Sequence, residues 1–307
     1  MKHRPLGWLL VSTVMLLTAC AANPSLPVGS PPAASDLPAR ASPPAVKLPP
    51  RIGLALGGGA ARGFAHVGVI QVLEEAGIRP ALVTGTSAGS LVAALYASGK
   101  TGAQLQQIAE TMEEATIADW TLQIFTRGVL RGEALAKYVN TQVDQRPIES
   151  MAIPLGIVAT DLNSGNDVLF QRGDTGTAVR ASSAVPAVFQ PVKFGGREYV
   201  DGGLVSPVPV RAARKMGAEL VIAVDISTQP EASAANGTLE ILLQTFTIMG
   251  KSISTIELKE ADVLVRPALN GVSSADFGAR RRSIEAGRQA MRAALPQLRA
   301  AIEEKTR

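Results

Sequence analysis

The chain has 307 residues, of which 46% are hydrophobic and 18% charged, and this composition suits one globular domain of roughly 250 residues with additional segments. The formal net charge is +4, and removing Lys2 and Arg4 with an N-terminal leader lowers it by two, to about +2, so no nucleic acid is expected as a partner. Cys20 is the only cysteine, which excludes an intramolecular disulfide and a cysteine-based metal cluster.

The first residues have the pattern of a secretory signal. Lys2 and Arg4 precede an apolar run at residues 8–17, which is too short to span a bilayer, and small residues follow it. The sequence Leu17-Thr18-Ala19-Cys20 resembles the lipobox of bacterial lipoproteins. The resemblance implies that residues 1–19 are a signal peptide and that Cys20 is lipidated. A plain secreted protein with a coincidental cysteine is the alternative.

The resemblance to lipoproteins also bears on location. In lipoproteins, an aspartate directly after the cysteine would send the protein to another membrane, and this chain has Ala21 there. The resemblance therefore implies an anchor in the outer membrane, facing the periplasm, in a source with two membranes. Residues 21–50 contain nine of the chain's twenty prolines, together with many Ala and Ser, and are expected to form an extended tether. We therefore expect a lipidated cysteine and tether at residues 20–50, and one folded domain at 51–307.

From Arg51 onward, predicted strands and helices alternate. Strands are expected at 52–56, 81–84, 154–159, 168–171, 198–200, 220–225 and 262–266. Helices are expected at 64–76, 90–98, 104–114, 239–258 and from about 282 onward. This alternation predicts an α/β fold, a three-layer sandwich with a mostly parallel central sheet. Sites in such sheets lie at the carboxyl ends of strands, where both glycine-rich motifs of this chain fall.

The sequence "GTSAGS" follows the second predicted strand and precedes a predicted helix. Gly85 and Gly89 flank Ser87 two residues away on either side, as in a nucleophile elbow, where a serine occupies a sharp strand-to-helix corner. His3 and His66 are the only histidines, so no histidine follows Ser87 and the Ser–acid–His order of α/β-hydrolases is impossible. We expect His66 to be a packed structural residue.

A carboxylate is then the expected base for Ser87. Asp161, Asp201 and Asp225 all lie near the ends of predicted strands. Asp201 is favoured because Gly202 and Gly203 follow it and allow close approach, whereas the other two are expected to shape the edge of the sheet.

The glycine loop "GGGAARG" at 57–63 lacks the spacing and the acidic residue of a dinucleotide site, so no nucleotide cofactor is expected. Its backbone amides are suited to binding an oxyanion, and Arg62 is expected to support the loop or add positive potential.

The motifs "GGGAARG", "GTSAG" and "DGG", in this order, resemble those of the patatin-like phospholipase family, as does the segment "ASSAVPAVFQPV" before the aspartate. The resemblance covers about residues 51–268. It implies a patatin-like catalytic domain in which Ser87 is the nucleophile, Asp201 its partner in a dyad, and Gly58 and Gly59 the donors of the oxyanion hole. Ala60 stands where the family has the second glycine of its loop.

This resemblance implies a serine acyl hydrolase of lipase, phospholipase A or lysophospholipase type, with a lipid or phospholipid substrate and neither metal nor organic cofactor. Two alternatives remain open, an acyltransferase that uses the same acyl-enzyme and a non-catalytic lipid-binding lipoprotein. The apolar cluster Trp120, Leu122, Ile124 and Phe125 is interpreted either as core packing or as part of an acyl-chain site or lid.

Overall fold

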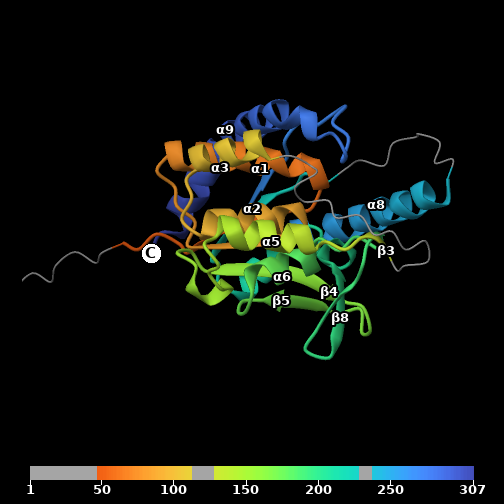
Figure 1. Cartoon of the computed structure of the whole chain (residues 1–307). Coiled ribbons are helices and arrows are strands. Elements are labelled where there is room, and N and C mark those ends of the chain that lie inside the picture. Colours follow the sequence, from red (N-terminus) through yellow and green to blue (C-terminus); the bar gives the residue numbers. More distant parts are fainter. Residues whose placement is uncertain (1–46, 113–127, 228–236) are drawn as a thin grey trace, which may run out of the picture. The chain divides into compact units, whose positions relative to one another are not determined.

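In the computed structural model, residues 47–112, 128–227 and 237–307 are described, and strands alternate with helices along them (Figure 1). The strands are β1 (Ile52–Leu56), β2 (Leu82–Thr86), β3 (Gly128–Leu130), β4 (Leu155–Asp161), β5 (Asp167–Phe170), β6 (Ala187–Phe189), β7 (Val192–Phe194), β8 (Arg197–Asp201), β9 (Leu220–Val224) and β10 (Val263–Val265). The helices are α1 (Phe64–Glu75), α2 (Ala88–Ala97), α3 (Gly102–Thr111), α5 (Glu133–Gln142), α6 (Thr175–Ser182), α7 (Val210–Lys215), α8 (Thr238–Glu257) and α9 (Arg280–Lys305).

The central sheet has eight strands. Its order is β10-β9-β1-β2-β4-β8-β7, with β5 also paired to β4, and a separate two-stranded sheet joins β3 to β6. The five strands from β10 to β4 are parallel, whereas β5, β7 and β8 run antiparallel to their neighbours. The predicted α/β class with a mostly parallel sheet is therefore confirmed, and an antiparallel region extends the sheet beyond β4.

Helices cover both faces of this sheet. Successive residues of a strand point to opposite faces, and since the residues of β1 are buried throughout, both of its faces are covered. On β1, the side chains of Ile52, Leu54 and Leu56 enter the large core that also contains residues of α1, α2, α3 and α9. Ala55 enters a second core, with α7. Figure 1 shows α1, α3 and α9 together at the top of the view, with α2 below them.

Strands β2 and β8 lie along the same edge of β4. On β4, Ile157 and Val158 pair with both β2 and β5, while Ala159 and Thr160 pair with both β5 and β8. Because β5 occupies one edge throughout, β2 and β8 must share the other. The last residue of β2, Thr86, pairs with Val158, and Asp201 at the end of β8 pairs with the next residue, Ala159.

The expected elements agree with the structure to within about two residues at most ends, but α5, α6, α7 and the short strands β3, β6 and β7 were not predicted. Helix α7 has only six residues, too few for a helical period to be recognised from sequence. The cluster at Trp120, Leu122, Ile124 and Phe125 lies outside the described residues, as do Cys20 and the rest of residues 1–46. Within the described ranges, no helix has the length and apolar character needed to cross a bilayer.

Candidate active site

Ser87 occupies the corner between β2 and α2 and has a strained backbone. Its φ of 53° and ψ of −126° place it in a region that residues with a side chain seldom adopt. Such strain costs on the order of 1–3 kcal/mol and persists only where the surrounding structure enforces it. The predicted nucleophile therefore has the backbone geometry of an elbow.

The flanking glycines make this corner sterically possible. A Cβ on Gly85 would lie 2.5 Å from the carbonyl oxygen of Gly89 and 2.5 Å from the Cα of Ser90. A Cβ on Gly89 would overlap the carbonyl oxygen of Leu56 on β1. Any other residue at either position would force the first turn of α2 away from the sheet.

Asp201 is buried, with 6% of its surface exposed. Its Oδ1 accepts a hydrogen bond of 2.6 Å from the amide of Gly203. Burial raises the pKa of this carboxyl to about 6, although hydrogen bonding to the Ser87 hydroxyl and to the Gly203 amide opposes the rise. A base whose pKa lies near the working pH is suited to proton transfer.

The second carboxylate oxygen of Asp201, Oδ2, is left free by the contact with Gly203. Oδ2 is enclosed and meets no donor at ideal hydrogen-bond geometry among the described residues, yet the Ser87 hydroxyl lies close enough to lower the pKa of the carboxyl. The contact is therefore long or poorly aligned. Catalytic hydrogen bonds often are so before substrate binds.

One segment holds the backbones of both residues. The Ser182 hydroxyl, at the end of α6, accepts a hydrogen bond of 2.8 Å from the Ser87 amide and donates one of 2.5 Å to the carbonyl of Val158. Two residues later, the Ala184 carbonyl accepts from the Asp201 amide at 3.0 Å. Ser182 and Ala184 belong to the "ASSAVPAVFQPV" segment, but no feature of the sequence predicts a role for either residue.

A second network ties the loop after Asp201 to β2. The Thr86 hydroxyl donates to the carbonyl of Ser206 at 2.8 Å, and the Ser206 hydroxyl donates to the carboxylate of Glu257 at 2.8 Å. Glu257 ends α8 and is 2% exposed, and its burial raises the pKa of its carboxyl. No sequence motif marked Glu257, because its partner Ser206 is distant along the chain.

The other two candidate aspartates are used structurally. Asp161 accepts hydrogen bonds from the amides of Asn163 and Ser164 and forms an ion pair of 2.7 Å with Arg197. Asp225 accepts from the amide of Ser227 and pairs with Arg266 at 3.0 Å. Both shape turns at the sheet edge, as expected.

His66 is packed, as expected. It is fully buried on α1, and burial lowers its pKa to about 4, so that the ring is neutral near pH 7. Its Nε2 lies 2.8 Å from the carbonyl oxygen of Gly57, which can only accept, so Nε2 carries the proton and donates it. His66 therefore fixes the start of the glycine loop.

The glycine loop requires one correction. The amide of Gly58 donates to the carbonyl of Pro207 at 2.9 Å, so this N–H is already used and the assignment of Gly58 as an oxyanion donor is wrong. Gly58 instead passes close to the serine, because a Cβ added to it would lie 3.1 Å from the Cβ of Ser87. Within the described part of the chain, the amides of Gly59 and Ala60 have no acceptor.

Two further residues, Ala60 and Arg62, shape the glycine loop. Ala60 has a φ of 49°, the left-handed conformation that favours glycine, at the position where the related motif has glycine. Arg62 is 7% exposed and donates from Nη2 to the carbonyl of Ser227 at 2.9 Å, which ties the loop to the segment that follows β9. Arg62 thus connects the glycine loop to this segment.

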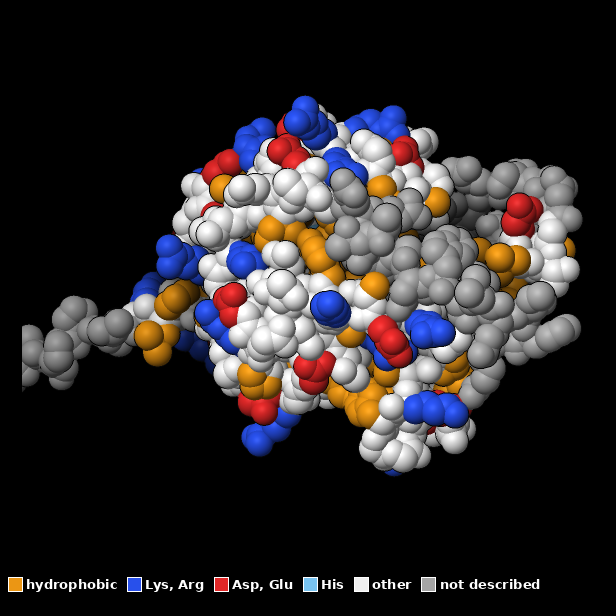
Figure 2. Space-filling view, in the orientation of Figure 1, with side chains coloured by type: hydrophobic (Ala, Val, Ile, Leu, Met, Phe, Trp, Pro, Cys, Tyr) orange, Lys and Arg blue, Asp and Glu red, His pale blue; other side chains and the backbone are white. Residues whose placement is uncertain are grey.

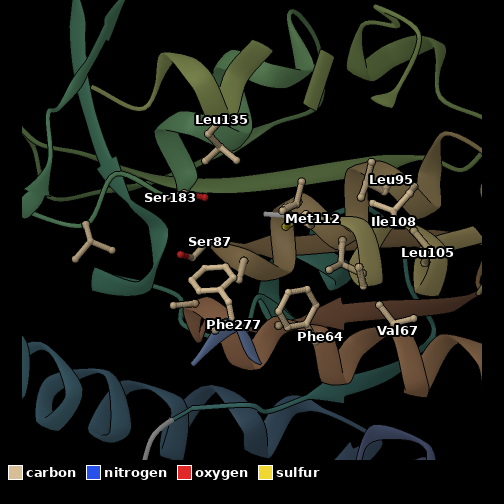
Figure 3. A pocket seen from close by; sticks show the side chains of 18 of the residues that line it. Phe64, Val67, Ser87, Leu95, Leu105, Ile108, Met112, Leu135, Ser183 and Phe277 are labelled. Carbon is tan, nitrogen blue, oxygen red and sulfur yellow. The ribbon is translucent and has the colours of Figure 1, made fainter. Parts of the chain in front are cut away.

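Ser87 opens onto an apolar cavity of about 180 Å³ (Figure 3). The cavity lies between α1, α2 and α3, and Phe64, Leu91, Ile108, Met112 and Phe277 are among its lining residues. Hydrophobic side chains also gather in the hollow between α3 and α5 on the molecular surface (Figure 2). Among the described residues, no three acidic, histidine or cysteine side chains are grouped to hold a metal ion.

Known proteins are similar to this chain in sequence and in fold. Residues 54–214 match the family model described as patatin-like phospholipase. An uncharacterized NTE family protein of Mycobacterium tuberculosis is 36% identical over 208 residues, covering 67% of this chain and 58% of that protein. Patatin-like phospholipase domain-containing protein 6 of Homo sapiens is 33% identical over 188 residues, covering 59% of this chain and 14% of that protein. The chain thus matches little more than half of the mycobacterial relative and a small part of the human one.

The fold also resembles that of a solved structure. VipD from Legionella pneumophila superposes with a TM-score of 0.53 at 14% sequence identity, over 81% of this chain and 67% of the VipD chain. At this identity the similarity concerns the fold alone.

Proposed function

Because the chain belongs to the patatin-like phospholipase family, we propose that it is a serine acyl hydrolase that cleaves fatty acyl esters of membrane lipids. The observation that carries the proposal is the pairing of a strained serine with a buried carboxylate at the mouth of an apolar cavity. The cavity accepts the acyl chain, and the ester carbonyl then lies at Ser87.

In the proposed first step, Ser87 Oγ attacks the carbonyl carbon while Asp201 Oδ2 takes the hydroxyl proton. The negative charge that develops on the carbonyl oxygen is bound by the amides of Gly59 and Ala60, which the described structure leaves without acceptors. The tetrahedral intermediate collapses, the ester C–O bond breaks, and the departing alcohol receives the proton from Asp201.

In the second step, Asp201 takes a proton from water, and the resulting hydroxide attacks the acyl-enzyme. A second tetrahedral intermediate forms at the same amides, and Ser87 leaves with the proton while the fatty acid is released. His66 is assigned no part in the proton transfers, because it is fully buried on α1 and its Nε2–H holds the carbonyl of Gly57.

Product analysis by mass spectrometry tests this function. The purified full-length chain is incubated with mixed phospholipids and an alcohol acceptor, and Ser87→Ala serves as the control. Free fatty acid and lysophospholipid that depend on Ser87 are the expected products. Acyl transfer to the alcohol without free fatty acid would replace hydrolase with acyltransferase, and lipid binding without any product would favour the non-catalytic alternative.

We propose in addition that the domain at 51–307 is held at a membrane through Cys20. The support is the sequence pattern alone, in which a leader at 1–19 ends at a lipobox-like cysteine and a proline-rich tether at 20–50 follows. Such an anchor would keep the catalytic domain near its lipid substrate, with the outer membrane facing the periplasm as the expected location.

A further inference from the structure

The acyl cavity is a slot between three helices, and each helix contributes one face. Helix α2 presents Ala88, Leu91, Val92 and Leu95 to it, which are spaced i, i+3, i+4 and i+7, as residues on one helical face are. Leu105, Ile108, Ala109 and Met112, in α3 and just after it, repeat this spacing. Phe64 and Val67 of α1 line a third side, and Leu135 of α5, Phe189 of β6 and Phe277 add to the lining.

The slot has a closed end away from the serine. Helices α2 and α3 are joined by a short connection, so the end of α2 lies near the start of α3, and Leu95 and Leu105 both line the cavity there. In Figure 3, Leu95, Leu105 and Val67 lie together at the end of the cavity opposite Ser87. These three side chains are only 2–3% exposed, which shows that this end is sealed within the core.

The length of the slot follows from helix geometry. Eight residues separate Ser87 from Leu95 along α2, which corresponds to about 12 Å at the rise of an α-helix. An extended chain advances about 1.2 Å for each bond, since three backbone bonds span about 3.5 Å. The slot therefore accommodates about ten carbon atoms beyond the ester carbonyl.

Building on the proposed hydrolase, we propose that the enzyme selects acyl chains of roughly eight to twelve carbon atoms. Val67, Leu95 and Leu105 set this limit as specificity-determining residues. Each methylene that enters an apolar pocket contributes to transition-state binding, whereas methylenes beyond the closed end must stay outside the slot or displace packed side chains.

The test is the dependence of kcat/KM on chain length, measured with the full-length chain on p-nitrophenyl esters of four to eighteen carbon atoms. We expect kcat/KM to rise by about fourfold for each added methylene up to about ten carbons, and then to level off or fall. Turnover with no dependence on length would overturn the inference and leave the hydrolase intact. No turnover of any ester would contradict the proposed hydrolase itself.

Two variants change the closed end in opposite directions. Leu105→Ala should move the optimum to chains longer by roughly two or three carbons, because it opens the sealed end. Val67→Phe should lower the ratio of ten-carbon to four-carbon turnover by about tenfold or more, because it shortens the slot. The matched control is Leu239→Ala, on a side chain of α8 that is 46% exposed, and it should leave the profile unchanged. If Leu105→Ala does not fold, Val67→Phe and the chain-length profile of the wild type test the inference. A folded variant whose optimal chain length equals that of the wild type would refute the role of these residues.

Discussion

Ser87 and Asp201 meet end to end along one edge of β4. Strand β2 brings the serine to this edge from one direction, and the antiparallel β8 brings the aspartate from the other. Thr86, just before the serine, pairs with Val158 of β4, and Asp201 pairs with the next residue, Ala159. The two residues are far apart in sequence, and the sheet brings them together.

The dyad should be inactivated by loss of either member. Ser87→Ala and Asp201→Asn should each lower kcat for ester hydrolysis by about 10³ or more, and the double variant should be little worse, because groups that act as a unit lose activity non-additively. His66→Gln should cost about tenfold, through the loop that it supports. Steady-state kinetics and labelling with a fluorophosphonate measure these effects. A well-folded Asp201→Asn enzyme with full turnover, beside an inactive His66→Gln, would make His66 the base.

The same aspartate should reduce stability at neutral pH. Its pKa is raised from 3.8 to about 6 in the folded state, so between these values the folded protein binds a proton that the unfolded chain does not. Stability therefore falls as pH rises through this window, and Asp201→Asn should be more stable above pH 7 by up to about 3 kcal/mol. The gain should vanish near pH 4. Chemical denaturation at both pH values measures it, and a variant that is less stable than wild type at pH 8 would contradict the burial argument.

Gly59 should tolerate no side chain. A Cβ there would lie 2.8 Å from the Cδ1 of Ile226 and 3.0 Å from its carbonyl oxygen, so Gly59→Ala must shift the loop that carries the proposed oxyanion donors. Loss of one donor lowers kcat by about 10² to 10³. Gly237→Ala is the matched control, because its Cβ would have no neighbour closer than 4.0 Å. Normal turnover by folded Gly59→Ala would exclude this loop from the chemistry.

Ser182 should position the nucleophile. Ser182→Ala leaves the amide of Ser87 and the carbonyl of Val158 without their partner, which costs about 1–3 kcal/mol for each buried group. We expect kcat to fall by about ten- to a hundredfold with KM little changed, because the cavity is intact and the strained serine is released. Ser252→Ala, on the exposed part of α8, is the control. An increase in KM alone would argue for a role in binding substrate instead.

Cys20 should determine where the protein is found. Cys20→Ala removes the proposed site of acylation, and stable anchoring needs more than one acyl chain or signal. The variant should move from the membrane fraction to the soluble fraction when cells are fractionated. An unchanged distribution would show that the anchor assignment is wrong, while the proposed chemistry of the domain would stand.

Much of the site was predictable because its motifs are local. The spacing of Gly85, Ser87 and Gly89 between a strand and a helix indicates an elbow, and the absence of a histidine after Ser87 indicates a carboxylate as the base. The choice of Asp201 over Asp161 and Asp225 rested on the glycines that follow it. The periodicity of apolar residues likewise predicted the α/β class, since both local geometry and burial follow from neighbours along the chain.

Other properties were decided only by the tertiary structure, because they depend on which distant groups the sheet brings together. The amide of Gly58 was expected to bind an oxyanion, but the carbonyl of Pro207 occupies it. Likewise, no sequence pattern around Ser182 predicts that its hydroxyl accepts a hydrogen bond from the amide of Ser87. The sequence determines which residue carries each hydrogen-bond donor or acceptor. Nearly every buried polar group must have a partner, and only folding determines which distant group that partner is.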